Sequence, residues 1–457
     1  MKILIVGAGE VGFNIAARLV EEGHDVVIVE RDETMLARAT EHLDVQGLRG
    51  HGARPKVLEE AGIATADMLV AVTDLDEVNM VACLSAAILG NKKIIKIARV
   101  RDPGYTDARI FNDPRVGIDL AINPERETAD KILTLLDYPD ATEVVDFAGG
   151  RVQLVGLRVR PHSRLAGLRF LEMPERFTRR VLIAAVHRGN EVIIPRGDDQ
   201  ILPDDELYLV VPRGQAIDLL GTLGAPVEPT TRVMIAGGSR LARFVAADLV
   251  ARGLSPKIIE PDARRARWMS EKLEGALVLH GNPTDAVVLR EENVGEMQVF
   301  IAASQVEETN VMAALLAQRL GARRVIATVN RMDYQPLARA IGVDVCISPR
   351  MAAVSSILHF IRRGRVVASR TLGEEQSAEA FEFEADPASE VVDVPMRDLR
   401  LPRGSLIACI LREDEVIVPA GDSVIHAGDH VVVVATKQAI GKVEAFLARR
   451  VRRVPRG

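Results

Sequence analysis

The feature that most constrains this chain is that it repeats itself. The segment RGHGARPKVLEEAGI aligns with LHGNPTDAVVLREENV so that Gly50 meets Gly281, and AVTDLDEVNMVACLSA aligns with AASQVEETNVMAALLA so that Asn79 meets Asn310. Both separations are 231 residues (281 − 50 and 310 − 79). A shared offset across separate segments indicates an internal duplication. The 457 residues also exceed what one hydrophobic core holds, so we expect several domains.

Each copy opens with apolar runs that alternate with amphipathic stretches. Short apolar runs of this kind are typical of buried strands, and the stretches between them have helical periodicity. Strand and helix in alternation predict a doubly wound parallel sheet, which is a Rossmann-like α/β lobe. The runs are KILIVG, HDVVIVE, MLVAVT, KKIIKIARV and GIDLAIN in the first copy, and RVMIAGG, PKIIE, QVFIAAS, ARRVIATV and GVDVCISP in the second.

A different sequence pattern follows each of these regions. Residues 181–211 alternate strand-like runs with the turn signals RGN, RGDD and PDDE, and residues 405–435 repeat the pattern. Pro195 meets Pro419 at an offset of 224 (419 − 195). The aspartates of PRGDDQILPDDE fall in turn-like positions, where we expect solvated side chains. The pattern predicts a small α+β lobe behind each parallel-sheet lobe.

The predicted domain boundaries follow from these two sequence patterns and from the composition of the linkers. The stretch GAPVEPTTR (224–232) is rich in Pro, Gly and Thr, as expected for a junction, and residues 370–390 form an acidic entry to the last lobe. The basic tail 448–457 is expected to be a frayed, solvated end. We predict Rossmann-like lobes at 1–125 and 230–350 and small lobes at 140–224 and 370–450.

Composition excludes several function classes. Only 4% of the residues are aromatic and the formal net charge is -6, so neither base-stacking surfaces nor a broad positive field for nucleic acid is expected. No window approaches ~18 uncharged apolar residues, so no membrane span is expected. The cysteines lie in apolar contexts without a CxxC spacing, which predicts buried thiols in a reduced, cytoplasmic compartment and no metal site: Cys83, Cys346 and Cys409.

The first glycine-rich turn has the pattern of a dinucleotide-binding motif. Gly7-Ala8-Gly9-Glu10-Val11-Gly12 follows a predicted strand and opens a predicted helix. Gly7 suits a tight turn, Gly9 lets backbone amides approach a pyrophosphate, and Gly12 allows close helix packing. Glu30 ends the second strand, where a carboxylate accepts the ribose hydroxyls of NAD rather than the phosphorylated ribose of NADP. The alternative is a glycine turn that holds no ligand.

Two further strand ends of the first copy carry polar side chains. Thr73 and Asp74 lie at the end of the run MLVAVT, at the edge where open parallel sheets bind ligands. Arg99 and Arg101 lie at the end of the run KKIIKIARV. These arginines either contact a phosphate or pair with nearby carboxylates such as Asp102, and the sequence leaves both alternatives open.

The second glycine-rich turn departs from the first. Gly237 and Gly238 retain the turn, but Ser239 stands at the place of Gly9 and Ala242 at that of Gly12. A serine adds a Cβ and a hydroxyl where a pyrophosphate would approach. Glu260 still ends the second strand. We expect weaker, altered or lost dinucleotide binding here, with a mononucleotide or an empty structural role as alternatives.

At this point the sequence resembles a known family. The ordered segments VGAGEVG, GHGARPKVLEEAGI, AVTDLDEVNMVAC and IARVRDP, then a small lobe, then a second round of both, are similar to the TrkA family of Trk-type potassium uptake regulatory proteins, built of two tandem RCK units. The resemblance implies a cytoplasmic gating subunit at the inner face of the membrane, not an enzyme. It implies homodimers or larger homo-oligomers that bind NAD(H), and possibly ATP or ADP, and control a membrane potassium-transporting subunit.

The resemblance also assigns nucleotide-binding positions. In the first copy they are Gly7, Ala8, Gly9, Glu10, Val11, Glu30, Thr73, Asp74 and Arg99. In the second copy they are Gly237, Gly238, Ser239, Arg240, Leu241 and Glu260, with Ser304 and Gln305.

Two other functions compete with this interpretation. An NAD-dependent oxidoreductase would need an acid, a base and a substrate clamp, and we expect His187 and His426 to be isolated. A purely structural scaffold would leave both glycine turns without a ligand. Ser239 favours this alternative for the second copy only.

Overall fold

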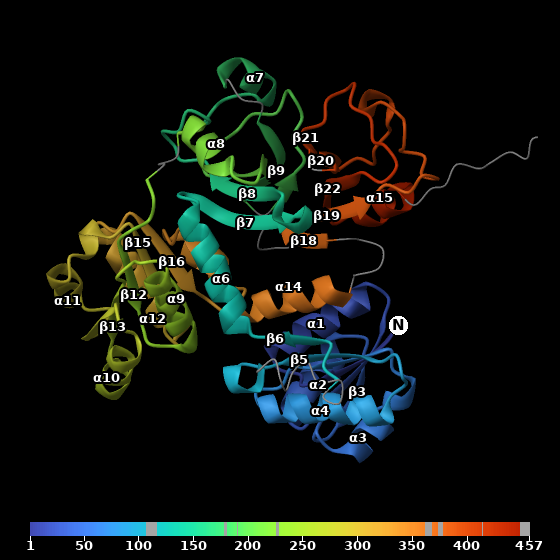
Figure 1. Cartoon of the computed structure of the whole chain (residues 1–457), viewed down its shortest axis with the longest axis vertical. Coiled ribbons are helices and arrows are strands. Elements are labelled where there is room, and N and C mark those ends of the chain that lie inside the picture. Colours follow the sequence, from blue (N-terminus) through green and yellow to red (C-terminus); the bar gives the residue numbers. More distant parts are fainter. Residues whose placement is uncertain are drawn as a thin grey trace, which may run out of the picture. The chain divides into compact units, whose positions relative to one another are not determined.

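The computed structural model of the chain (Figure 1) describes residues 1–106, 117–177, 181–189, 191–224, 228–361, 368–372, 378–413 and 415–447. The basic tail and parts of both predicted linkers, 225–227 and 373–377, lie outside these residues. The chain divides into two compact units. The first unit holds Met1–Ala129 and Ile347–Ile361, and the second holds Asp130–Cys346 and Arg362–Gly457.

The first unit contains a six-stranded parallel sheet in the order β3-β2-β1-β4-β5-β6. The central strands are buried on both faces, as the continuous apolar runs require. The predicted Rossmann-like fold is therefore confirmed. The elements are β1 (Lys2–Val6), α1 (Glu10–Glu21), β2 (Asp25–Glu30), α2 (Glu33–His42), β3 (Gln46–Arg49), α3 (Pro55–Glu60), β4 (Met68–Ala71), α4 (Asp76–Leu89), β5 (Ile95–Arg99) and β6 (Leu120–Ile122).

A helix from much later in the sequence completes the core of this unit. Helix α14 (Pro349–Ile361) packs against α1. Val354 and Ile357 of α14 belong to one buried cluster with Ile15 and Leu19 of α1. The first lobe therefore buries its apolar helix face against a segment that follows the second copy of the parallel-sheet lobe.

The second unit holds the second Rossmann-like lobe and both small lobes. The parallel sheet of this lobe has the order β14-β13-β12-β15-β16-β17, which repeats the first sheet strand for strand. Helix α6 (Pro124–Asp137) begins in the first unit and continues into the second. The other elements are β12 (Val233–Ala236), α9 (Arg240–Ala251), β13 (Lys257–Glu260), α10 (Ala263–Lys272), β14 (Leu277–His280), α11 (Ala286–Glu291), β15 (Val299–Ala302), α12 (Glu307–Arg319), β16 (Arg324–Thr328), α13 (Tyr334–Ala340) and β17 (Val345–Ile347).

The two small lobes are five-stranded antiparallel sheets with short helices. Their strand orders are β10-β9-β11-β8-β7 and β18-β19-β22-β20-β21. The two sheets share one apolar core, in which Phe147 and Tyr208 of the first lobe meet Cys409 and Val432 of the second. The elements are β7 (Ala141–Phe147), β8 (Val152–Arg158), α7 (Met173–Arg176), β9 (Leu182–Arg188), β10 (Glu191–Ile193), β11 (Glu206–Pro212) and α8 (Ala216–Thr222), then β18 (Ala368–Leu372), β19 (Ala378–Glu384), β20 (Ser405–Arg412), β21 (Glu415–Ile417), β22 (His430–Thr436) and α15 (Ile440–Leu447).

One sequence expectation about these lobes is wrong. Asp205, predicted to be solvated in a turn, is only 1% exposed and receives two hydrogen bonds from Arg188, at 2.8 and 2.7 Å. Its counterpart Asp429, at the offset of 224 (429 − 205), is paired with Arg412 in the same bidentate way. Each ion pair joins the end of one strand, β9 or β20, to the turn before the strand that lies beside it in the sheet, β11 or β22. The turn signals do mark turns, but they carry no information about a partner on another strand.

A buried arginine joins the end of α6 to the second Rossmann-like lobe. Arg324, at the start of β16, is 6% exposed, and its guanidinium donates to the carbonyl oxygens of Leu135 (2.9 Å), Tyr138 (3.4 Å) and Ala141. Burial lowers the Arg324 pKa to about 10, so the side chain stays charged at neutral pH. It is a second donor to the carbonyl groups of Leu135 and Tyr138, which also accept backbone amides, and it links the end of α6 to the start of β7 at Ala141.

The three cysteines are buried, as their apolar sequence contexts predict: Cys83, Cys346 and Cys409. Burial raises the pKa of Cys83 to about 12 and that of Cys409 to about 12, which keeps both thiols protonated and unreactive. Among the described helices, none has the length and apolar character needed to cross a membrane.

Replacing Arg324 by Met should destabilise the second unit by about 3 kcal/mol, because the three carbonyl groups lose a buried, charged hydrogen-bond donor. The neighbouring Arg323→Met is the control, since Arg323 is half exposed and makes a single long ion pair with Glu228, at 3.4 Å. Urea unfolding followed by circular dichroism measures the difference. Equal urea midpoints for the two variants would contradict the role given to Arg324.

Candidate functional site

The first glycine-rich turn is held by close backbone approaches. Gly7 has φ +105°, and a Cβ at this position would lie 3.1 Å from the Thr73 amide nitrogen. A Cβ at Gly12 would lie 1.9 Å from the Gly7 carbonyl oxygen, so a larger residue does not fit between turn and helix. Gly9 differs, since a Cβ there would meet nothing within 4 Å. The fold requires Gly7 and Gly12, whereas the space at Gly9 is open.

The open space lies at the N-terminus of α1. Gly9 is the N-cap residue, and it has no side chain that could accept a hydrogen bond from the first-turn amides. Such an uncapped N-terminus favours a negatively charged group, because amide donors and the helix dipole point toward it. Ala8 and Val11 are buried in the core, and the Glu10 carboxylate accepts a hydrogen bond from Arg38 at 2.6 Å. Backbone groups, rather than these side chains, therefore face the opening.

Glu30 stands beside this turn, at the carboxyl end of β2. Its Oε2 accepts the Ala8 amide at 2.7 Å, and its Oε1 accepts the amides of Arg31 and Asp32, at 2.8 and 2.9 Å. The carboxylate thus fixes the shape of the glycine turn. A carboxylate has about four acceptor positions, so it retains capacity for a ligand hydroxyl after these three bonds.

A buried side-chain amide, that of Asn79, connects the ends of β4 and β5. In the sequence this residue stands out only as part of the repeat. The Asn79 Oδ1 accepts the amide and the hydroxyl of Thr73, at 2.8 and 2.7 Å. Its Nδ2 donates to the carbonyl oxygens of Thr73 and Arg99, at 3.0 and 2.9 Å. Asn310 makes the equivalent bonds in the second copy, to Ser304 and Thr328. Two asparagines at the shared offset are the feature of the sequence from which this buried amide could have been predicted.

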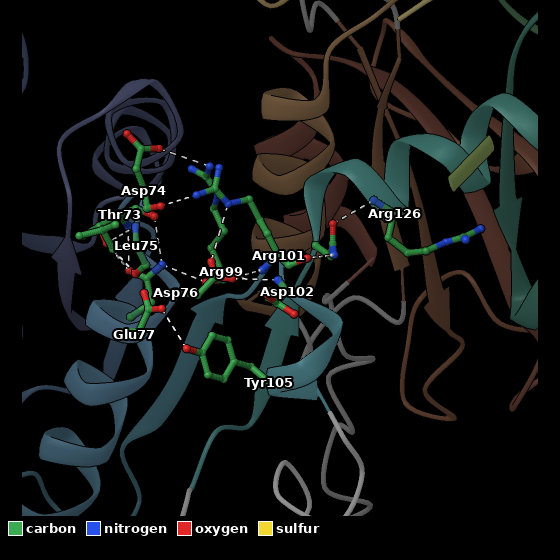
Figure 2. A network of polar contacts seen from close by, with 12 residues as sticks. Thr73, Asp74, Leu75, Asp76, Glu77, Arg99, Arg101, Asp102, Tyr105 and Arg126 are labelled. Carbon is green, nitrogen blue, oxygen red and sulfur yellow. Dashed lines mark hydrogen bonds and ion pairs between the residues drawn. The ribbon is translucent and has the colours of Figure 1, made fainter. Parts of the chain in front are cut away.

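Arg99 and Arg101 project from this junction among carboxylates (Figure 2). The Arg99 Nη2 lies 3.4 Å from Oδ1 of the exposed Asp74, and the Arg101 Nε lies 3.7 Å from Asp76 Oδ1. Asp76 Oδ2 also accepts the amides of Arg101 and Asp102, at 2.9 and 2.8 Å. The pairing alternative is therefore present in part, with Asp74 and Asp76 as the partners and not the carboxylate of Asp102.

These ion pairs leave the two arginines incompletely satisfied. The Nε atoms of Arg99 and Arg101 are buried without a hydrogen-bond partner in the described part of the chain, as is Asp76 Oδ1. Burial and the neighbouring charge of Arg101 lower the Arg99 pKa. Two guanidinium groups this close, one of them paired only with an exposed carboxylate, favour the approach of an anion.

The second glycine-rich turn is closed by its own side chains. The Ser239 hydroxyl accepts the Ala242 amide at 3.2 Å and donates to the Ala303 carbonyl oxygen at 2.5 Å. It caps α9 where α1 is uncapped. Leu241 is buried in the lobe, and Arg240 is exposed.

The carboxylate of this second turn is also enclosed. Glu260 is 1% exposed, accepts the Asp262 amide at 2.8 Å and lies 3.6 Å from the Arg265 guanidinium. A Cβ at Gly238 would lie 2.7 Å from Glu260 Oε2, and one at Gly237 would lie 2.7 Å from the Ser304 Cα. The polar groups that face the opening in the first copy are engaged within the protein here.

The second copy also lacks the arginine pair. Its counterpart of Asp76 is Glu307, which accepts the amides of Asn330 and Arg331. Arg99 and Arg101 therefore correspond to Thr328 and Asn330, both 229 residues later (328 − 99 and 330 − 101). Asp74 corresponds to Gln305, an exposed residue. Arg99, Arg101 and Asp74 are thus replaced by neutral residues in the second copy, whereas Asp76 is replaced by another acid.

Two histidines expected to be isolated have partners. His426 Nδ1 lies 2.8 Å from Asp393, and His187 Nδ1 lies 3.7 Å from Glu206. Neither contact was visible in the sequence, because the partners are distant along the chain. In the described ranges, no group of three or more His, Cys, Asp or Glu side chains is arranged to hold a metal ion.

These features define a class of protein: two Rossmann-like lobes, one with an open glycine turn, each joined to a small antiparallel lobe. The TrkA-N domain model matches residues 3–124 and 233–349, and the TrkA-C domain model matches 154–224 and 380–448. A "Trk system potassium uptake protein TrkA homolog 2" of Methanosarcina mazei is 37% identical over 97% of this chain and 99% of its own length. The "Trk system potassium uptake protein TrkA" of Halomonas elongata is 37% identical over 97% and 98%.

The chain belongs to the TrkA family of Trk system potassium uptake proteins. Among solved structures, the GsuK RCK domain matches with a TM-score of 0.61 at 18% identity, over 98% of this chain and 95% of that chain. The GsuK channel bound to NAD matches with a TM-score of 0.61 at 18% identity, over 98% and 79%. At these identities the structural matches establish the shared fold.

Replacing Ser239 by Ala should loosen the first turn of α9, because the Ala242 amide loses its cap, at a cost of about 1 kcal/mol. Ser239→Gly, which copies the first lobe, should cost only a few tenths. Hydrogen exchange of peptides covering α9 measures both, with about fivefold faster exchange expected for Ser239→Ala. Exchange in Ser239→Ala at the rate of the unaltered chain would show that the hydroxyl is not a cap.

Proposed function

We propose that this chain is the nucleotide-binding regulatory subunit of a Trk-type potassium uptake system. The observation that carries the proposal is the contrast between its two lobes. The first combines an uncapped α1 N-terminus at Gly9, a carboxylate at Glu30 and incompletely satisfied arginines beyond Thr73 and Asp74. In the second lobe, side chains occupy or replace each of these groups. One regulatory ligand per chain therefore fits the contrast best.

The ligand that suits the first lobe is NAD(H), with ATP or ADP as further candidates. Amides around Gly7, Ala8, Gly9, Glu10 and Val11 would receive the pyrophosphate, and Glu30 would receive the hydroxyls of an unphosphorylated ribose. Thr73, Asp74 and Arg99 would complete the site at the ends of β4 and β5. The solved GsuK channel bound to NAD, which shares this fold, supports the assignment.

We assign the second lobe a structural role. Ser239 supplies the cap that a ligand phosphate would otherwise provide, and Glu260 is buried against Arg265. Of the positions that the family resemblance assigns to the second copy, Gly237, Gly238, Arg240 and Leu241 then serve the turn and the core. We divide the chain accordingly into Rossmann-like lobes 1–125 and 230–350 and small lobes 140–224 and 370–450.

The partner is a membrane potassium-transporting subunit, and the chain acts on it from the cytoplasmic side without catalysing a reaction. The names of the relatives, Trk system potassium uptake proteins, support this assignment. We infer a homodimer or larger homo-oligomer held together by the small lobes. A ligand shifts such an assembly only by binding one of its states more tightly, and occupancy of the first lobe would do so by changing the angle between Rossmann-like lobes.

Replacing Gly9 by Ser should abolish tight binding of the nucleotide while the fold is retained. A Cβ at Gly9 has space, but a serine hydroxyl would cap α1 as Ser239 caps α9 and would displace the ligand phosphate. Calorimetry with NAD, NADH, ATP and ADP should give one site per chain, with affinity reduced ~100-fold in Gly9→Ser, about 3 kcal/mol. Gly441→Ser, at another glycine with open space, is the control.

The same variants test the regulatory role. Potassium flux through the transporting subunit, reconstituted with the unaltered chain, should depend on nucleotide, and this dependence should be lost with Gly9→Ser and kept with Gly441→Ser. Equal nucleotide affinity in all three proteins would refute the site. Turnover of NADH by the chain alone would favour the oxidoreductase alternative instead.

A further inference from the structure

Two helices of the second Rossmann-like lobe, α9 and α10 (Figure 1), carry an arginine surface made of Arg240, Arg243, Arg264, Arg267 and Trp268. The first two are three residues apart on α9, and the other three have i, i+3 and i+4 spacing on α10, so each set shares one helix face. The residues that the helices bury lie on the opposite faces: Leu241, Ala242, Val245, Ala246 and Leu249 of α9, and Ala266 and Met269 of α10. The arginine surface therefore points away from the core.

One contact joins the two helices at this surface. The Arg243 guanidinium lies over the Trp268 ring, 4.8 Å from its centroid. Arg243 is half-buried, and burial, followed by the charge of Arg240, lowers its pKa. Trp268 remains 43% exposed. The cation–π contact thus holds an exposed aromatic ring among guanidinium groups.

Two carboxylates lie near these charges without neutralising them all. Glu260 is 3.6 Å from the neighbouring Arg265 but is itself buried. Asp262 caps α10 by accepting the Arg265 amide at 2.8 Å, and this bond, with the charge of Arg265, lowers the Asp262 pKa. Within the described residues, the guanidinium groups of the arginine surface form no ion pair: those of Arg240, Arg243, Arg264 and Arg267.

The first Rossmann-like lobe has a different arrangement at the same place. At the offset of 230, Arg240 corresponds to Glu10 (240 − 10), and Trp268 corresponds to Arg38 (268 − 38). There the Arg38 guanidinium lies over the Phe13 ring, 4.5 Å from its centroid, and donates to Glu10 at 2.6 Å. The second lobe keeps the contact between a guanidinium and an aromatic ring, but it has an arginine in place of the neutralising acid.

The charges of the two helix pairs differ accordingly. Residues 239–251 and 261–272 hold six basic and three acidic side chains, a net charge of +3 (6 − 3). The equivalent residues 9–21 and 31–42 hold three basic and five acidic side chains, a net charge of −2 (3 − 5, with His42 neutral). The duplicated fold therefore does not require the positive charge, which is a local feature of a chain with a net charge of -6.

We propose that the arginine surface docks on the anionic phospholipid headgroups of a membrane. Guanidinium groups bind phosphate through paired hydrogen bonds, and basic residues near an anionic bilayer are attracted to it. The charges are spread over two helices rather than gathered around one point, which suits many headgroups better than a single ligand. An exposed tryptophan ring is suited to the headgroup region of a bilayer, whereas an acidic protein segment would complement the charges alone.

This docking extends the proposed function and rests on its placement of the chain beneath a membrane. It gives a role to the lobe whose glycine turn is closed by Ser239. The first Rossmann-like lobe would then bind the nucleotide, and the second would contact the bilayer beside the transporting subunit.

Trp268 is the only tryptophan in the sequence, so its fluorescence reports on this surface alone. Phosphatidylglycerol vesicles added to the full-length chain, without nucleotide, should shift the Trp268 emission to shorter wavelength and should co-sediment with the protein. Phosphatidylcholine vesicles should do neither, and added salt should reverse the binding, because exposed charges are screened. Soluble polyglutamate, a probe for an acidic protein segment, should leave the emission unchanged.

Charge variants locate the binding surface. Arg264→Gln/Arg267→Gln should weaken vesicle binding about 25-fold, because each basic residue near an anionic surface contributes about fivefold. Arg240→Glu, which copies the first lobe, should weaken it by a similar factor. The matched control is Arg164→Gln/Arg169→Gln, which removes two exposed arginines of the first small lobe and should leave binding unchanged.

Three results would each overturn the proposal. They are an unchanged Trp268 emission with phosphatidylglycerol vesicles, a response to polyglutamate as large as that to the vesicles, and equal weakening of vesicle binding in the control variant. The vesicles contain neither nucleotide nor transporting subunit. A negative result therefore leaves the calorimetric test at Gly9 unaffected, and the two proposals fail separately.

Discussion

The close approach of α1 to its own strand is the constraint on which the rest of the first lobe depends. The Gly7 carbonyl oxygen stands where a Cβ of residue 12 would be, 1.9 Å from it, so only glycine permits this approach. This close approach places the uncapped N-terminus of α1 at the edge of the sheet, beside Glu30 and the strand ends that Asn79 connects. The second copy has Ala242 at the corresponding position, so the contact between α9 and its glycine turn leaves space for a methyl group.

The two copies have therefore kept the same buried core and strand order, and they differ in the side chains at the carboxyl edge of the sheet. The buried amides Asn79 and Asn310 make equivalent hydrogen bonds, and each lobe orders its strands in the same way. The differences lie in side chains that follow the strands: Gly9 against Ser239, and Arg101 against Asn330. Such changes leave the buried core intact, so a duplicated lobe loses or keeps a ligand without losing its fold.

The sequence predicted the parallel sheets because their central strands are continuous apolar runs. It missed β3 and β14, whose residues QGLR and LVLH are largely exposed and give no such signal. Local turn signals also misplaced Asp205, because burial depended on Arg188 from another strand. The glycine turn and Glu30 could be proposed as site residues because they follow a known local pattern, whereas Asp76 and helix α14 act through contacts with residues distant in sequence.

The position of α14 has a consequence for how the protein is made. The first lobe leaves the ribosome before α14, because the helix that covers Ile15 and Leu19 ends at residue 361 of the same chain. Until then, an apolar surface of α1 remains open during synthesis, which favours association with chaperones or with the corresponding helix of another chain. Completion of the N-terminal lobe is thereby tied to translation of more than three quarters of the protein.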